Sequence, residues 1–255
     1  QCVKFSDNIL FDNDKMTNRE FLKSINKVSN WLSGKGITQN TKVVLNEIKS
    51  PIFDILCYAV WSIGAIVVII NDDIDIDQID SKMIIDSNFD FSKIEKQSDN
   101  YTTTNNILLN DQAIEYYYNG KGIMLSHYNL LINTYGILKE LNILHHETLN
   151  INIPINSTAY IVINTILPLY AGTSVKNDDA QITIGTDIKS DYQVIFEWKE
   201  IEDTKPQRIY ILPEATAILS IGKKPNHLQS VVKENNSYKI NGHSVMMGYT
   251  DENLN

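Results

Sequence analysis

Apolar segments of two different periodicities alternate along the first half of the sequence, and this alternation constrains the fold most strongly. Between Phe21 and Leu32, apolar residues recur every three or four positions, which predicts an amphipathic helix. Lys42 to Ile48 and Val67 to Ile70 are short apolar runs typical of buried strands, and Ser50-Pro51 can open a second helix between them. Strands that alternate with helices predict a parallel sheet covered by helices on both faces.

The first helix carries its own start and stop signals. Thr17 and Glu20 have the spacing of a capping box, in which each side chain accepts from the backbone of the other residue. Gly34 and Gly36 follow the last apolar position, where a helix ends easily. We therefore expect a helix from about residue 18 to residue 34.

The remaining elements follow the same reasoning. We expect further strands over 9–11, 107–109, 113–118, 149–155, 173–175, 181–184, 193–198, 208–212, 217–221, 228–233, 238–240 and 245–247. We expect helices after Ser126 and over 161–170, and a polar loop over 93–106. The 255 residues then form an α/β fold of layered, mostly parallel sheets with flanking helices, with a core over 1–178 and a shortened second sheet and small β-rich lobe over 179–255.

Charge narrows the range of partners. The chain has 31 Asp and Glu against 22 Lys and Arg, and the only arginines are Arg19 and Arg208. An acidic chain is not attracted to nucleic acid or to an anionic membrane, so we expect neither as a partner. No charged and then apolar leader opens the sequence, and Cys2 and Cys57 are too few for a disulfide scaffold, so we expect a cytoplasmic location.

Two groups of potential metal ligands have simpler explanations. Asp72, Asp73, Asp75, Asp77 and Asp80 alternate as in a calcium loop, but the central Gly and terminal Glu of such loops are missing, and a solvated turn explains them better. His127 precedes a predicted helix and His145-His146 follow it, without Cys, Asp or Glu at metal-ligand spacing. We therefore expect no metal site.

Several segments, in order, resemble the large N-terminal portion of the adenylate-forming superfamily, which contains acyl-CoA synthetases, peptide-synthetase adenylation domains and luciferases. The matching segments are 17–45, 59–68, Lys121 to Leu130 (close to "KGVmLSHrNL"), 154–173, and 222–249 with its Gly248-Tyr249. The resemblance implies the fold given above. It also implies two nucleotide-binding motifs, and both are altered in this chain.

The first altered motif is the phosphate loop, which the family builds from Ser, Thr and Gly. Here the stretch reads Tyr116 to Gly122, and tyrosines run directly into Asn119-Gly120. We expect a tight turn between a strand and a helix that is too short to close around a triphosphate, although Lys121 could still meet one phosphate as a point charge. By resemblance, Gly120, Lys121 and Gly122 are a vestigial part of the nucleotide site.

The second altered motif is the family's "YG.TE", which orders adenine and presents a Glu to magnesium. Tyr210 and Glu214 align with it, but Ile211 replaces the Gly and Pro213 replaces the Thr. A branched side chain crowds the nucleotide and proline lacks the N–H donor. The segment between Thr173 and Tyr210 is also much shorter than in the family.

These changes favour a catalytically degenerate, adenylation-like domain without catalytic residues or cofactors. By resemblance, it would be a structural or docking module of a biosynthetic assembly line for nonribosomal peptides or polyketides, with neighbouring domains or proteins as partners. The alternative is an active acyl- or aminoacyl-adenylating half-enzyme that uses ATP and Mg²⁺ and is completed by a separate C-terminal domain. A third possibility is a small-molecule binder whose residual pocket is lined by the tyrosines near Tyr116.

Overall fold

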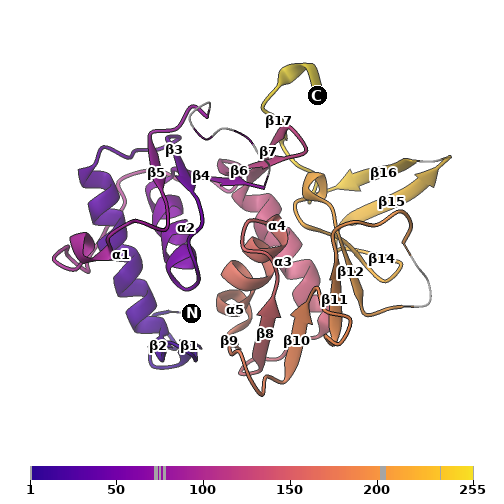
Figure 1. Cartoon of the computed structure of the whole chain (residues 1–255), viewed down its shortest axis with the longest axis horizontal. Helices are drawn as coiled ribbons and strands as arrows, with labels where there is room; N and C mark the ends of the chain where they lie inside the picture. Colours follow the sequence, from indigo (N-terminus) through magenta and orange to yellow (C-terminus); the bar gives the residue numbers. More distant parts are fainter. Residues whose placement is uncertain are drawn as a thin grey trace. The chain divides into compact units, whose positions relative to one another are not determined.

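The computed structural model describes residues 2–71, 74, 76, 79–201, 205–235 and 237–254, which form two compact units (Figure 1). The N-terminal unit comprises Cys2–Asn8, Met16–His127 and Gly248–Asn255. The C-terminal unit comprises Ile9–Lys15 and Tyr128–Met247. Each unit has its own sheet, and each is described by itself below.

The N-terminal unit is built on a six-stranded sheet with the order β17-β7-β6-β4-β3-β5. Its strands are β3 (Lys42–Leu45), β4 (Ile66–Ile70), β5 (Met83–Ile85), β6 (Gln112–Tyr118), β7 (Lys121–Ser126) and β17 (Gly248–Tyr249). The four strands β3 to β6 are parallel, whereas β7 runs antiparallel to β6 and β17 antiparallel to β7. Helices α1 (Asn18–Gly34) and α2 (Ile52–Ile63) pack on each other, and a short 3-10 helix, η2 (Phe91–Ile94), follows β5 (Figure 1).

Helix α1 begins and ends as the sequence predicts. The Thr17 side chain accepts from the Glu20 N–H, and the Glu20 carboxylate accepts from the Thr17 N–H at 2.8 Å, which confirms the capping box. Hydrogen bonds from Thr17 to its carboxylate lower the pKa of Glu20. Phe21 and Leu32 are completely buried on the face that meets the core. The capping box therefore fixes the register in which this apolar stripe faces inward.

The C-terminal unit is built on a sheet whose strands follow the order β14-β13-β12-β11-β10-β8-β9-β1. These strands are β1 (Ile9–Phe11), β8 (Thr148–Asn152), β9 (Ser174–Val175), β10 (Ile182–Gly185), β11 (Tyr192–Ile195), β12 (Arg208–Ile211), β13 (Ile218–Ile221) and β14 (Lys224–Pro225). From β1 to β12 all neighbours are parallel, and the last two pairs are antiparallel. Strands β15 (Gln229–Glu234) and β16 (Ser237–Gly242) form a separate hairpin. The short β2 (Met16–Thr17) directly precedes α1, and η5 (Glu252–Leu254) follows β17.

Two helical segments belong to the C-terminal unit. Helix α3 (His127–Leu141) directly follows Ser126, the last residue of β7. The second segment is continuous and consists of α4 (Thr158–Tyr160), a π-helix η3 (Ile161–Ile166) and α5 (Leu167–Ala171). Gly172 ends it in the left-handed conformation at φ 75°, as the sequence predicts.

A buried amide joins α3 to the start of β13 inside the C-terminal unit. The Asn133 side chain is completely buried; it donates to the Ala215 and Ile218 carbonyls at 3.2 and 3.0 Å and accepts from the Ile218 N–H at 2.9 Å. Asn226, also buried, donates to the Asn133 carbonyl. Gly136 lies one turn further along α3, where a Cβ would collide with the Asn226 side chain. The amide thus completes backbone hydrogen bonds that neither the helix nor the sheet provides.

The predicted α/β class, with layered sheets that are largely parallel and flanking helices, is confirmed. Two strand predictions are wrong, because 107–109 is irregular chain and 245–247 lies in turns before β17. Five strands were not predicted: β2, β5, β7, β14 and β17. Of the predicted β-rich stretch, β10 to β14 continue the larger sheet and the β15–β16 hairpin forms a sheet of its own. The proposed division at residue 178 concerns domains and stays a prediction.

Two further predictions concern parts that the structure describes incompletely. Asp72, Asp73, Asp75 and Asp77 lie outside the described residues. Within the described ranges, no group of three or more His, Cys, Asp or Glu could hold a metal ion. The same ranges contain no helix that is both long and apolar enough to cross a membrane.

Replacing Asn133 by Ala should lower the free energy of unfolding by about 2–4 kcal/mol, because it leaves buried backbone groups of Ala215 and Ile218 without partners. Asn106→Ala, at an exposed position, is the matched control and should change it by less than about 0.5 kcal/mol. Urea denaturation followed by circular dichroism measures both. Equal stabilities would show that the amide does not hold α3 to β13.

Candidate functional site

The predicted phosphate-loop stretch forms the β6–β7 hairpin of the N-terminal unit. The ladder extends to the pair Tyr118 and Lys121, so the turn consists of Asn119 and Gly120 alone. Both residues are left-handed, with φ values of 51° and 72°. Two left-handed residues are what a type I′ hairpin turn requires, and Asn-Gly is its preferred sequence. The predicted tight turn is therefore present, but it joins strand to strand and not strand to helix.

Gly122 and Lys121 contact the chain at β17. A Cβ on Gly122 would collide with the Thr250 side chain, whose backbone N–H donates to the Gly122 carbonyl at 2.7 Å. The Lys121 ammonium lies 5.0 Å from the centroid of the Tyr249 ring, within cation–π range. By contrast, a Cβ on Gly120 would meet nothing within 4 Å. The close approach of β17 thus accounts for the glycine at position 122.

A buried carboxylate lies on β6 near this hairpin. The Glu115 side chain is 1% exposed, and its oxygens lie 2.8 and 3.0 Å from the Lys42 ammonium on β3. The Tyr117 hydroxyl donates to the same carboxylate at 2.8 Å. Burial, and then this hydrogen bond, raise the pKa of Tyr117. Sequence analysis missed this group, because 73 positions separate Lys42 from Glu115 and no local pattern links them.

The second predicted motif follows β12 in the C-terminal unit. Tyr210 is 1% exposed, with its ring edge-on to Trp198 at 5.8 Å between centroids. Ile211, at the motif's glycine position, is buried as well. Glu214 is half-buried in the 3-10 helix η4 (Pro213–Ala215), and its carbonyl accepts from the Met246 N–H at 2.9 Å.

The residue that follows η4 has an unusual backbone conformation. Thr216 has φ 71° and ψ −63°, a left-handed φ that is rare for a β-branched residue. Its hydroxyl donates to the Ser244 carbonyl at 2.6 Å and the residue is completely buried. Contacts with the segment before β17 therefore hold the chain at the end of this motif.

The structure thus places the five predicted site residues in two groups. Gly120, Lys121 and Gly122 lie together on the hairpin of the N-terminal unit. Tyr210 and Glu214 lie together at the end of β12 in the C-terminal unit. No sequence signal predicts that Tyr249 and Thr250 meet the first group.

The hairpin can be tested for its fit to a nucleotide triphosphate. A phosphate cradle needs several successive backbone N–H groups that converge on the anion. Here only Asn119 and Gly120 lie outside the paired ladder, and the ammonium of the adjacent Lys121 lies over the Tyr249 ring. This turn does not fit a triphosphate cradle.

The histidines noted in the sequence each have identifiable neighbours. The backbone N–H of His127 donates to the Asp111 carbonyl at 3.2 Å, and its ring is edge-on to Trp61 at 6.1 Å. Burial lowers the pKa of His127 below its ordinary 6.5, and the charge of Asp111 opposes this in part. The rings of His145 and His146 are tilted against each other at 3.7 Å in the C-terminal unit.

The fold is that of the N-terminal domain of adenylate-forming enzymes. The N-terminal domain of FACL13 from Mycobacterium tuberculosis superposes with a TM-score of 0.72 at 11% identity, over 96% of this chain and 87% of that one. A long-chain-fatty-acid-CoA ligase (FadD1) from Archaeoglobus fulgidus gives 0.74 at 13% identity, over 93% and 70%. MatB from Rhodopseudomonas palustris gives 0.73 at 15% identity, over 94% and 68%.

Sequence comparison gives a match at the start of the chain. The family model described as "AMP-binding enzyme" matches residues 1–90. None of the curated proteins matches significantly. The predicted resemblance to adenylate-forming enzymes is therefore confirmed, by the family model over these residues and by the fold over nearly the whole chain.

The contact between β17 and β7 can be tested at Gly122. Gly122→Ala should displace Thr250 and speed hydrogen exchange at the amides of Thr250 and its neighbours in β17, because the added methyl collides with the threonine side chain. Combining it with Thr250→Gly should restore slow exchange. Exchange that is unchanged in Gly122→Ala would show that β17 does not lie on β7 in solution.

The half-buried His127 should make stability depend on pH. Because its pKa is lower in the folded chain, the unfolded chain binds a proton first as pH falls through about 6.5, so the free energy of unfolding should decrease between about pH 7.5 and pH 5. This decrease should be smaller in His127→Gln than in His146→Gln, an exposed control. Urea denaturation across this pH range measures it, and identical profiles for the two variants would contradict the assignment.

Proposed function

We propose that the protein is a catalytically degenerate, adenylation-like domain that serves as a structural or partner-docking module. The observation that carries the proposal is the two-residue turn Asn119–Gly120, which occupies the place of the family's phosphate loop. A turn of this length brings too few backbone N–H groups together for the phosphates of ATP. The strands on either side keep their pairing, so the fold persists without the loop.

The second motif supports the same proposal. Ile211 is buried at the position where the family uses glycine to let the backbone approach adenine. Pro213 opens η4 and has no N–H to offer to a ligand. Tyr210, the motif's aromatic residue, is packed against Trp198. Both halves of the nucleotide site therefore depart from the family pattern.

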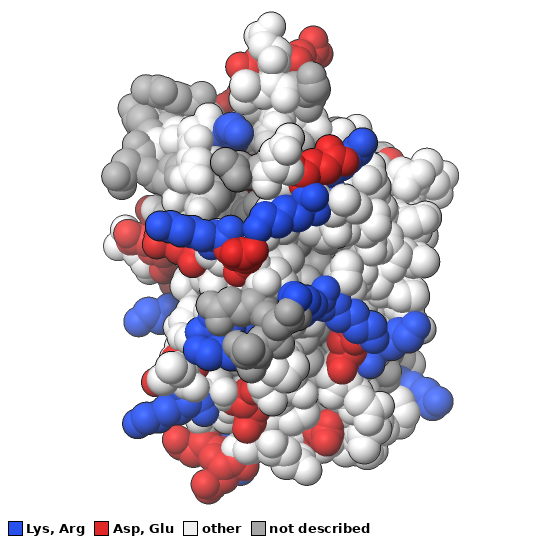
Figure 2. Space-filling view, turned by 90° about the vertical axis from the view of Figure 1, so that its right-hand side faces the viewer, with Lys and Arg blue, Asp and Glu red and all other residues white. Residues whose placement is uncertain are grey.

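The setting proposed for this module is a cytoplasmic assembly line for nonribosomal peptides or polyketides, with neighbouring domains or proteins as partners and no cofactor. The distribution of charged side chains on the surface is consistent with protein partners. On the face drawn in Figure 2, blue side chains form two bands and red side chains lie beside both of them, so the two signs of charge are found together there. A nucleic-acid-binding surface usually needs a continuous positive field.

A second candidate is an active acyl- or aminoacyl-adenylating half-enzyme that a separate C-terminal domain completes. It is favoured by Glu214, which aligns with the family's magnesium-binding Glu and is half-buried beside the end of β12. The similar structures also include a protein named a CoA ligase. If this candidate is correct, ATP and Mg²⁺ are the cofactors and Lys121 contacts a phosphate.

Calorimetric titration of the full chain with ATP and Mg²⁺ separates the two candidates, with an active adenylating enzyme titrated in parallel. We expect no micromolar binding, and no ATP–pyrophosphate exchange across a broad carboxylate panel, because the turn cannot enclose the phosphates. Micromolar binding or exchange that is lost in both Lys121→Ala and Glu214→Ala, but kept in the exposed control Lys189→Ala, would establish the enzyme instead.

A further inference from the structure

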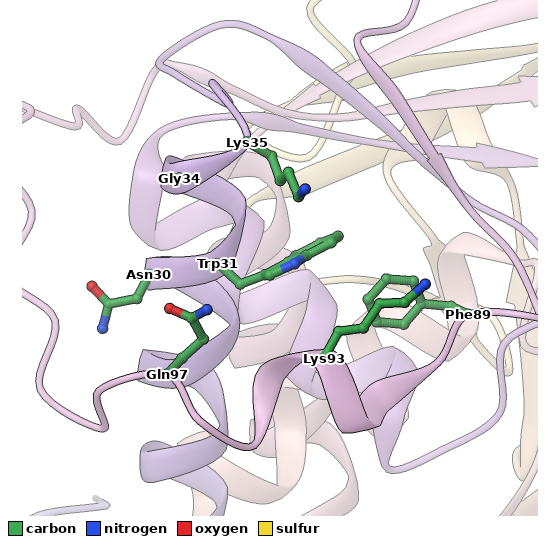
Figure 3. Close-up of a pocket in the computed structure, with 7 residues that line it drawn as sticks. All are labelled: Asn30, Trp31, Gly34, Lys35, Phe89, Lys93 and Gln97. Atoms are coloured by element: carbon green, nitrogen blue, oxygen red, sulfur yellow. The ribbon is translucent and has the colours of Figure 1, made fainter.

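A hollow of about 540 Å³ lies on the N-terminal unit, between the end of α1 and the segment that contains η2 (Figure 3). Its size is within the range of small-molecule sites. None of the five residues predicted for the nucleotide site lines it. The hollow therefore requires an explanation of its own.

Two aromatic side chains form the apolar part of the hollow. The rings of Trp31 and Phe89 lie 4.9 Å apart between centroids at an angle of 65°, and both residues are half-buried. Phe91 supports Phe89 edge-on at 4.8 Å, which limits its movement. Part of each aromatic residue therefore remains accessible while the pair itself is held in place, as in a site for a flat apolar group.

Two lysines supply positive charge at the same place. Lys35 and Lys93 line the hollow together with Trp31 and Phe89, and Figure 3 shows Lys35 at the end of α1 and Lys93 on the segment opposite. Among the described residues, neither ammonium has a carboxylate within 4.0 Å. The Asp90 carboxylate accepts from the Ser92 N–H at 3.0 Å, and hydrogen bonds from Ser92, then the charge of Lys93, contribute to lowering the pKa of Asp90. Asp99, further along the segment, is 3.4 Å from Lys23. Two lysines without ion pairs beside aromatic rings, in a chain of net charge −9, indicate an anionic ligand.

Hydrogen bonds from α1 hold the far wall of the hollow. The Asn30 side chain donates to the Ser98 and Asn100 carbonyls at 2.8 and 3.0 Å, and the Asn26 side chain donates to the Asp99 carbonyl at 2.8 Å. These bonds attach the segment after η2 to the helix. A pre-formed wall lowers the entropy cost of binding.

We propose that this hollow binds a small anion that carries a planar aromatic group, such as an aryl phosphate. The aromatic group lies against Trp31 and Phe89, and the anionic group is bound by Lys35 and Lys93. The site is separate from the altered nucleotide motifs and does not depend on whether the domain is catalytic.

Calorimetric titration of the full chain with 2-naphthyl phosphate tests this site, with inorganic phosphate and 2-naphthol as half-ligands. We expect the naphthyl phosphate to bind at least about tenfold more tightly than either half-ligand, because only it uses both the rings and the lysines. Binding should weaken about tenfold in Lys35→Gln combined with Lys93→Gln. It should be unchanged in Lys189→Gln combined with Lys239→Gln, which alters net charge equally at exposed positions.

Several outcomes would overturn the proposal: no binding of the naphthyl phosphate, equal binding of 2-naphthol, or equal weakening in both double variants. Weakening in Lys121→Ala would place the ligand at β7 and would also overturn it. Trp31→Leu should weaken binding about tenfold through loss of the aromatic surface. Because Trp31 also packs on Phe89, circular dichroism must show that Trp31→Leu is folded. If this variant is unfolded, the test rests on the variants of the exposed residues Lys35 and Lys93.

Discussion

The type I′ turn at Asn119–Gly120 is the constraint on which the N-terminal unit and its interpretation depend. Both turn residues are left-handed, a conformation that glycine and asparagine adopt at low cost. The turn reverses the chain within two residues and so places β7 antiparallel to β6. Strand β7 then provides the edge on which β17 pairs, and it ends where α3 begins. The same two residues thus determine the position of the C-terminal strand and the absence of a longer loop.

Buried polar contacts between distant residues complete each unit. In the N-terminal unit, the Glu115 carboxylate has its charge balanced by Lys42, so that β3 and β6 are linked across β4. In the C-terminal unit, Asn133 satisfies backbone groups at the start of β13. Removing one partner of such a contact leaves a buried group without compensation, which costs more than the contact contributes when intact. These contacts therefore specify which elements meet. Their contribution to net stability is smaller than the penalty for breaking them.

The sequence predicts those parts of the structure that depend on neighbouring residues. The capping box of α1, the buried strand β4 and the tight turn at Asn119–Gly120 each require only a few adjacent residues, and all three are present. Strand β7 was missed because Lys121 to Ser126 lacks a clear alternation of polar and apolar residues. The reason for glycine at position 122 could not be found either, since it lies in Thr250, far along the chain. The hollow beside Trp31 likewise depends on Phe89 and on a segment that follows another strand.

The contrast between the preserved sheets and the short turn has a thermodynamic explanation. Removing a helix or a central strand would expose the apolar faces that pack on it, at a cost of about 25 cal/mol for each Å² of apolar surface. Shortening a loop between two paired strands exposes no such surface, and a shorter loop loses less entropy on closure. The β6–β7 ladder remains paired up to Tyr118 and Lys121, beside a buried strand β4. A chain that does not need to hold a nucleotide can therefore lose this loop without losing its fold, as the proposed function requires, because a fold does not by itself specify a chemistry.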